Sequence, residues 1–160
     1  MNKRRELFSS LAFSKKGQGS FETRPPYYID EASFNRCSQC SGICEKVCEE
    51  NIIVLTKNGS PVLDFTKSGC TYCDKCAIAC EYGVLNLENK KLINVKFEID
   101  MLKCLSWQKT MCFSCKDICN DNAVEFLGLF RAEIDYDKCT NCGFCVGVCP
   151  TNAIKVKKWQ

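Results

Sequence analysis

Hydrophobic residues along this chain gather in short runs separated by longer polar stretches. Four apolar runs, rich in branched side chains, occupy residues 52–55, 84–87, 123–126 and 153–156. Runs of this length and composition are typical of strands. Each follows a polar stretch that is long enough for a loop and a short helical turn, so the pattern predicts four small loop–turn–strand units.

The residues after the first two runs predict how the strands pair. Asn58-Gly59 follows the first run and is a strong hairpin signal, so we expect a return strand over residues 62–65. Residues 88–91 are expected to turn the chain in the same way after the second run. Each strand would then pair with the start of the next unit, giving an α+β fold with little regular secondary structure.

The main feature of the composition is its high content of cysteine. The chain has 16 Cys in 160 residues, and they recur about every 33 residues as four groups of four. The groups are Cys37, Cys40, Cys44 and Cys48; Cys70, Cys73, Cys76 and Cys80; Cys104, Cys112, Cys115 and Cys119; and Cys139, Cys142, Cys145 and Cys149. Each group precedes one of the apolar runs, so the unit is repeated four times.

The spacing within the groups is that of iron–sulfur ligands. The second group reads C-x2-C-x2-C-x3-C, and the fourth is the same run closed by Pro150. Three such thiolates wrap around one [4Fe–4S] cluster, and in two-cluster bacterial ferredoxins the fourth thiolate binds the other cluster. The first group has one extra residue before Cys44, and the third has a long C-x7-C lead from Cys104 to Cys112. We predict repeated bacterial-ferredoxin-like units in which all 16 cysteines bind up to four [4Fe–4S] clusters, the third site being the least regular.

Other uses of the cysteines fit the sequence less well. A disulfide framework is disfavoured because cysteines this close together chelate metal more readily than they pair, and no segment resembles a cleavable signal peptide. Zinc also accepts four thiolates, but zinc ribbons place their two C-x2-C pairs well apart. In the third group, Cys104 could be a buried apolar residue beside a three-cysteine remnant. The spacing leaves open whether the first group exchanges its fourth cysteine with the second group or with the fourth.

Charge and the absence of His exclude several classes of function. The formal net charge is +3 and there is no His, which rules out mixed Cys/His zinc fingers and His-ligated haem. Four clusters of about −2 each would leave the loaded protein at about −5, so the basic balance is no evidence for nucleic-acid binding. No run approaches the roughly 18 apolar residues of a membrane span. With its thiols committed to metal and no His as a base, the chain is expected not to be an enzyme.

The first 35 residues contain no cysteine and differ from the rest. Lys3, Arg4 and Arg5 begin a basic arm, expected to be helical over residues 2–16, and Pro25-Pro26 predicts an extended linker. A solvated tail is the alternative. The predicted segments are the arm and linker at 1–35 and ferredoxin-type units at 36–66, 67–98, 99–130 and 131–160, the third atypical.

Aromatic residues lie beside the cysteines in the second, third and fourth units. They are Tyr72, Tyr82, Trp107, Phe113 and Phe144. Such rings could conduct electrons, but we expect them to exclude water from the clusters and so to tune their potential.

These features together resemble the NapF family, the ferredoxin-type accessory proteins of the periplasmic nitrate reductase system. The resemblance rests on the four cysteine groups, the C-x7-C lead, the basic start with Arg4-Arg5, and the Arg24-Pro25-Pro26 stretch with residues 30–34 after it. It implies a cytoplasmic protein that contacts the molybdenum-containing catalytic subunit before that subunit is exported. The contact would serve the maturation or reductive activation of the catalytic subunit. The arm with Lys3, Arg4 and Arg5 would make that contact. A general polyferredoxin that carries electrons for respiratory complexes is the alternative.

The Arg4-Arg5 pair is also similar to a twin-arginine export signal, because Leu7-Phe8 follows it. A signal of that kind needs a longer apolar stretch and a cleavage site, and residues 9–16 supply neither. We therefore expect an uncleaved arm.

Overall fold

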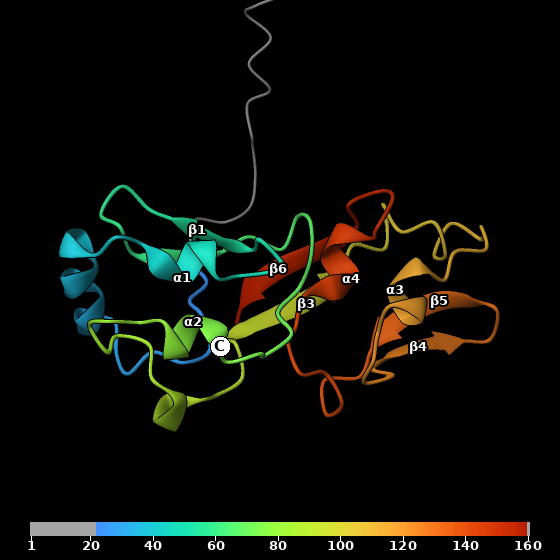
Figure 1. The fold of residues 1–160 in the computed structure, drawn as a ribbon. Helices are drawn as coiled ribbons and strands as arrows, with labels where there is room; N and C mark the ends of the chain where they lie inside the picture. Colours follow the sequence, from blue (N-terminus) through green and yellow to red (C-terminus); the bar gives the residue numbers. More distant parts are fainter. Residues whose placement is uncertain (1–21, 160) are drawn as a thin grey trace, which may run out of the picture.

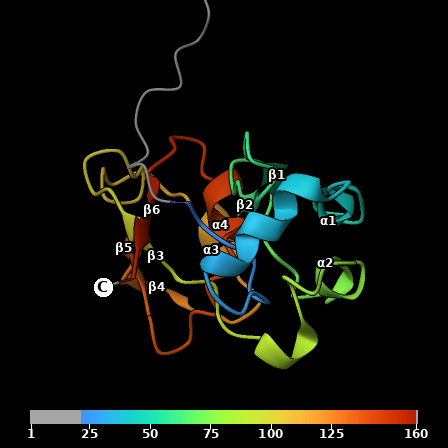
Figure 2. The same cartoon turned by 90° about the vertical axis from the view of Figure 1, so that its left-hand side faces the viewer.

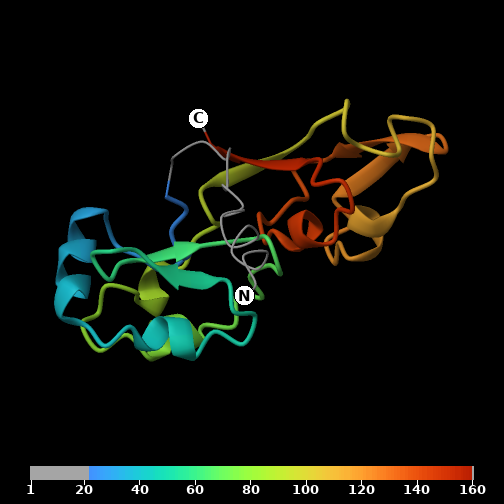
Figure 3. The same ribbon diagram turned by 90° about the horizontal axis from the view of Figure 1, so that it is seen from above.

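The computed structural model describes residues 22–159, so the arm predicted at residues 2–16 lies outside the described part of the chain (Figure 1). The described chain forms two lobes, which the view from above separates clearly (Figure 3). The first lobe contains η1 (Ala32–Gln39), α1 (Ile43–Lys46), β1 (Ile53–Leu55), β2 (Pro61–Leu63), α2 (Lys75–Ile78) and η2 (Leu87–Asn89). The second contains β3 (Val95–Ile99), α3 (Ser114–Asp117), β4 (Val124–Leu127), β5 (Phe130–Ile134), α4 (Phe144–Gly147) and β6 (Ile154–Lys158).

The strands of the described residues form three two-stranded antiparallel sheets. β1 pairs with β2, with Ile53 opposite Leu63, so the predicted hairpin is confirmed. β4 pairs with β5 in the same manner, with a register shift between Phe126 and Leu127. The last strand, β6, returns to pair with β3, placing Ile154 opposite Ile99. The final sheet therefore closes the second lobe by joining its first and last segments.

The run at residues 84–87 differs from its prediction. Leu85 forms an isolated antiparallel bridge with Tyr28, and η2 occupies the place of the expected turn at residues 88–91. The side chain of Asn86 accepts a hydrogen bond from the backbone N–H of Glu88 and begins η2. The expected hairpin is therefore wrong. The run pairs with the segment before the first cysteine group, which is the same plan that joins β3 and β6 in the second lobe.

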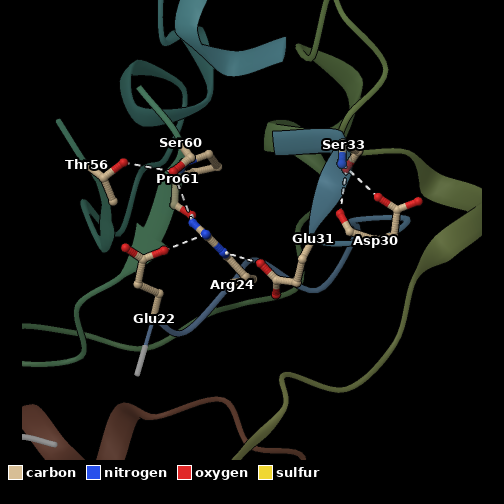
Figure 4. Close-up of polar contacts among 8 residues, drawn as sticks. All are labelled: Glu22, Arg24, Asp30, Glu31, Ser33, Thr56, Ser60 and Pro61. Carbon is tan, nitrogen blue, oxygen red and sulfur yellow. Dashed lines mark hydrogen bonds and ion pairs between the residues drawn. The ribbon is translucent and has the colours of Figure 1, made fainter. Parts of the chain in front are cut away.

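Residues 23–31 run past the two prolines without a helix or a strand, with a turn at Pro26-Tyr27, and they pack against the first lobe. Pro25, Pro26 and Tyr27 are fully buried. Arg24 fixes the segment, since its guanidinium donates to Glu31, Ser60 and the carbonyl of Pro61 at 3.1–3.2 Å (Figure 4). It also forms an ion pair with Glu22 at 2.5 Å and lies 4.2 Å from the centre of the Phe34 ring. The segment is thus a structural part of the first unit, and η1 crosses the outer end of the first lobe (Figure 2).

The regular elements are too short to be stable alone. Each of the four α-helices within residues 22–159 has four residues, whereas isolated helices need roughly 12 or more. Packing between elements stabilises these short helices instead, since α1 lies against α2 and α3 lies against α4. Between the lobes, the Phe65 ring packs edge to face on the Phe97 ring, with 5.5 Å between the ring centres. The predicted fold class, repeated ferredoxin-like units with little regular structure, is confirmed.

Candidate iron–sulfur centres

Each cysteine loop leads into a one-turn helix that carries the third cysteine of its group. These cysteines are Cys44, Cys76, Cys115 and Cys145. In three loops the residue before the helix is left-handed, namely Gly42, Asp74 and Gly143. The third loop has Phe113 there, at φ −121°. The loops therefore share one geometry, from which the third departs locally.

A second repeated turn follows the fourth cysteine of each group. The residue three positions later is left-handed in every unit and donates its backbone N–H to the carbonyl of that cysteine at 3.0–3.2 Å. These residues are Asn51, Gly83, Asn122 and Asn152. Asn and Gly tolerate the left-handed conformation better than other residues. Sequence reasoning missed these four positions, although their repetition after each group could have revealed them.

The chain beyond this turn points backbone amides at cysteine sulfurs. Leu85 donates its N–H to Cys80 Sγ at 3.4 Å. Ala153 donates to Cys149 Sγ at 3.2 Å, and Ala123 donates to Cys119 in the same way. Hydrogen bonds to the cysteine sulfurs of an iron–sulfur site are among the factors that set the reduction potential of a bound cluster.

Two cavities show how the groups combine. One is lined by Cys70, Cys73 and Cys76 of the second group together with Cys48 of the first. The other is lined by Cys104, Cys112 and Cys115 of the third group together with Cys149 of the fourth. In both, the fourth cysteine of one group completes the three-cysteine loop of its neighbour in the same lobe.

The electrostatic neighbours of the remaining loops indicate the reciprocal exchange. Burial raises the pKa of Cys37, and the next contributions come from Cys80 and then Cys40. Burial likewise raises the pKa of Cys145, followed by the charges of Cys142 and Cys139 and then of Cys115 and Cys119. The structure thus brings Cys80 to the first loop and Cys119 to the fourth. Of the two pairings that the spacing left open, this arrangement favours first with second and third with fourth, in keeping with the contacts of α1 with α2 and of α3 with α4.

The chemistry of these sets suits a cluster. All 16 cysteines are free thiols. Among residues 22–159, no three Cys, Asp or Glu side chains converge closely enough to hold a single metal ion. A tetrahedral zinc ion binds four thiolates at one atom, whereas a [4Fe–4S] cluster binds each thiolate at a different iron and so holds the sulfurs farther apart.

The long lead of the third loop is an ordered structure. Cys104 is held from both sides, since its N–H donates to the carbonyl of Asp100 and its carbonyl accepts from Gln108. Trp107 Nε1 donates to the carbonyl of Ala132 at 2.9 Å and fixes the loop to β5. Ser106 is 1% exposed, and its Oγ has no hydrogen-bond partner, the only such buried side-chain atom in the described chain. This loop brings Cys104 to the same cavity as Cys112 and Cys115 rather than leaving it as an isolated apolar residue.

The aromatic residues beside the cysteines differ in their surroundings. Phe113 packs against Phe126 with 4.9 Å between ring centres, whereas Tyr82 is 39% exposed and donates its hydroxyl to the carbonyl of Gln39. Tyr72 is half-buried, and its hydroxyl donates to the carbonyl of Thr140 in the other lobe at 2.6 Å. The proposed role in excluding water from the clusters stays a prediction.

Comparison with known protein families defines the class to which this arrangement belongs. A 4Fe-4S dicluster domain matches residues 36–84, which contain the first and second cysteine groups. A 4Fe-4S binding domain matches residues 132–155, which contain the fourth. The chain is therefore a ferredoxin-type protein that binds multiple [4Fe–4S] clusters.

Individual relatives identify the family within this class. The chain is 31% identical to the ferredoxin-type protein NapF of Escherichia coli K12 over 136 residues, which cover 82% of each protein. It is 34% identical to the ferredoxin-type protein NapF of Haemophilus influenzae Rd over 157 residues, covering 94% of this chain and 88% of the relative. The chain belongs to the NapF family, and the resemblance seen in its sequence is confirmed.

A more distant relative belongs, by its name, to an ion-translocating redox complex. It is a component of the Na(+)-translocating ferredoxin:NAD(+) oxidoreductase complex of Acetobacterium woodii, and it is 34% identical over 122 residues, covering 71% of this chain but 35% of the relative. In the chain described here, no helix over residues 22–159 is long and apolar enough to cross a membrane.

Proposed function

We propose that the 16 cysteines hold four [4Fe–4S] clusters, each bound by three cysteines of one loop and the fourth cysteine of its neighbour. The sets are Cys37, Cys40, Cys44 and Cys80; Cys70, Cys73, Cys76 and Cys48; Cys104, Cys112, Cys115 and Cys149; and Cys139, Cys142, Cys145 and Cys119. The two cavities that combine cysteines of neighbouring groups carry this assignment. The units at 36–66, 67–98, 99–130 and 131–160 are proposed to function as two pairs, with residues 23–34 packed onto the first.

The protein is proposed to serve the periplasmic nitrate reductase system as a cytoplasmic accessory factor. Membership of the NapF family supports this role, because the resemblance to that family implies a function in the nitrate reductase system. Its partner would be the catalytic subunit prior to export, and the clusters would supply electrons for maturation or reductive activation of that partner. The protein itself would act without a substrate, because its thiols are committed to metal.

Co-purification under anaerobic conditions tests this role. The loaded protein is expected to bind the catalytic subunit that still carries its export signal, and to lose that binding when residues 2–16 are deleted. A full-length variant in which Lys3, Arg4 and Arg5 are each replaced by Gln separates the loss of charge from the loss of length. Equal binding by the deletion variant would show that the arm is not the contact element. No binding by the full-length protein would contradict the accessory role.

A second function is favoured by the similarity to the component of the Na(+)-translocating complex. A general polyferredoxin would exchange electrons rapidly with several unrelated carriers and would show no selective binding to the nitrate reductase. Stopped-flow reduction of a panel of low-potential carriers, alongside the co-purification, distinguishes the two functions.

A further inference from the structure

Tyr72 and Asn141 occupy the same position in two different cysteine loops. Tyr72 precedes Cys73, the second cysteine of its group, and Asn141 precedes Cys142 in the fourth group. Both residues adopt left-handed backbone conformations, at φ +54° and +58°. Asn tolerates this conformation well, but for a bulky residue such as Tyr it is uncommon and costs about 1–2 kcal/mol. The tyrosine is therefore held there by its surroundings.

Both side chains reach the backbone of Ile93, which lies where the chain passes from the first lobe to the second. The hydroxyl of Tyr72 accepts the N–H of Ile93 at 3.2 Å and donates to the carbonyl of Thr140 at 2.6 Å. The amide of Asn141 donates to the carbonyl of Ile93 at 3.1 Å. Ile93 is 1% exposed and Asn141 is 8% exposed, so the bond between them is buried, whereas the two hydrogen bonds of the Tyr72 hydroxyl are partly buried. Two equivalent residues of two loops thus meet on one residue of the connection.

The loops themselves are in direct contact at this place. The N–H of Cys70 donates to the carbonyl of Cys142 at 2.6 Å, which joins the second loop to the fourth through their backbones. The packing leaves no room for larger residues: a Cβ added at Gly69 would lie 2.4 Å from the backbone nitrogen of Phe144, and one at Gly143 would lie 2.2 Å from the ring of Phe65. The second and fourth sites therefore face each other across a close-packed junction.

We propose that Tyr72 and Asn141 are positioning residues that lock the second and fourth cysteine loops together and so make the junction the route for electrons between the lobes. The inference rests on the crosswise cysteine sets proposed above. Within each lobe, those sets already bring two sites together. The junction joins the two pairs into one series that runs first, second, fourth, third. In each transfer one site loses the electron that its neighbour gains, and no bond is made or broken.

Tyr72→Phe tests the proposal, because it removes the hydroxyl and keeps the ring. Tyr82→Phe is the matched control, since it removes an exposed tyrosine hydroxyl of the same lobe that bonds only to Gln39. In Tyr72→Phe, amide hydrogen exchange of the peptide containing Ile93 is expected to accelerate about tenfold, in keeping with the loss of one partly buried hydrogen bond. The EPR spectrum of the fully reduced protein should show a weaker spin–spin interaction between the lobes and unchanged interactions within each lobe.

Iron content separates this inference from the cysteine assignment on which it rests. Wild-type iron in Tyr72→Phe, combined with reduced inter-lobe coupling, supports the proposal. Coupling equal to that of wild type and of Tyr82→Phe would overturn it. If Tyr72→Phe binds less iron, Asn141→Gly decides, because glycine keeps the left-handed backbone and removes the other hydrogen bond to Ile93. Iron loss in both variants would show that these residues build the individual sites and would also overturn the proposal.

Discussion

Cys48 belongs to the first cysteine group by sequence but lines the cavity of the second loop. We expect Cys48→Ala to remove the cluster held by Cys70, Cys73 and Cys76 and to spare the one held by the first loop. The truncation should cost little by itself, because Cys48 is only partly buried and the large stability losses of point mutations come from buried positions. Loss of iron would therefore report loss of a ligand rather than unfolding.

The iron content of double variants shows which cysteines serve the same site. A fully loaded chain with four [4Fe–4S] clusters contains about 16 irons, and loss of one site leaves about 12. Cys48→Ala combined with Cys73→Ala should still leave about 12, because both residues serve the same site. Cys48→Ala combined with Cys37→Ala should leave about 8, because two sites are lost.

Iron and sulfide analysis of anaerobically purified protein measures these values, with EPR to detect three-iron remnants. If a damaged site keeps a three-iron cluster, each loss is smaller but the comparison between the two double variants is unchanged. The opposite result, in which the Cys37 double loses as much iron as one single variant and the Cys73 double loses twice as much, would refute crosswise sharing. Cys119→Ala, combined in turn with Cys142→Ala and Cys112→Ala, repeats the test in the second lobe.

Two further predictions concern positions next to the loops. Gly143→Ala should lower the free energy of unfolding by about 2–5 kcal/mol in denaturant titrations, because its φ is +86° and the new Cβ would collide with Phe65. Gly83→Ala, where φ is +62° and nothing lies within 4 Å, should cost only about 1–2 kcal/mol, and equal losses would contradict the importance of packing at Gly143. Arg24→Gln should lower the potential of the first site in EPR-monitored redox titrations, because reduction adds negative charge and the Arg24 cation lies near that loop. Burial raises the pKa of Cys37, and the charge of Arg24 partly opposes that rise. Arg36→Gln, at an exposed and screened position, should leave the potential unchanged, and an equal shift in both variants would argue against a specific effect of Arg24.

Much of the local structure follows from the sequence because it depends on neighbouring residues. The runs at 52–55, 123–126 and 153–156 contain strands, and the Asn58-Gly59 turn forms the hairpin that it predicts. The prediction for the run at 84–87 failed because Leu85 pairs with Tyr28, which lies in a segment that the sequence presents as a linker. A bridge between residues so far apart depends on tertiary packing, for which the local pattern carries no signal.

The relations among the cysteine loops were harder to predict. The chain lengths between successive groups are similar, so spacing could not decide which groups exchange a cysteine. The proposed exchange rests on the packing of α1 on α2 and of α3 on α4, which only the folded chain shows. The sequence distinguishes Tyr72 only as an aromatic residue next to a cysteine. Its contact with Ile93 involves a backbone group, and a backbone group leaves no trace in side-chain composition. The turn residues Asn51, Asn122 and Asn152 are different, because their repetition is visible in the sequence itself.

The pairing of β3 with β6 determines the order in which the two lobes can fold while the chain is being synthesised. The first lobe draws its cysteines from residues 37–80, and the bridge from Tyr28 to Leu85 can close it while the ribosome is still making the second lobe. The second lobe cannot close in this way, because β6 must be synthesised before β3 has its partner, and the third loop must wait for Cys149 before its cavity is complete. With the cysteine sets proposed above, a nascent chain could load the two sites of the first lobe during translation, while the irregular third loop stays open until Cys149 has been synthesised.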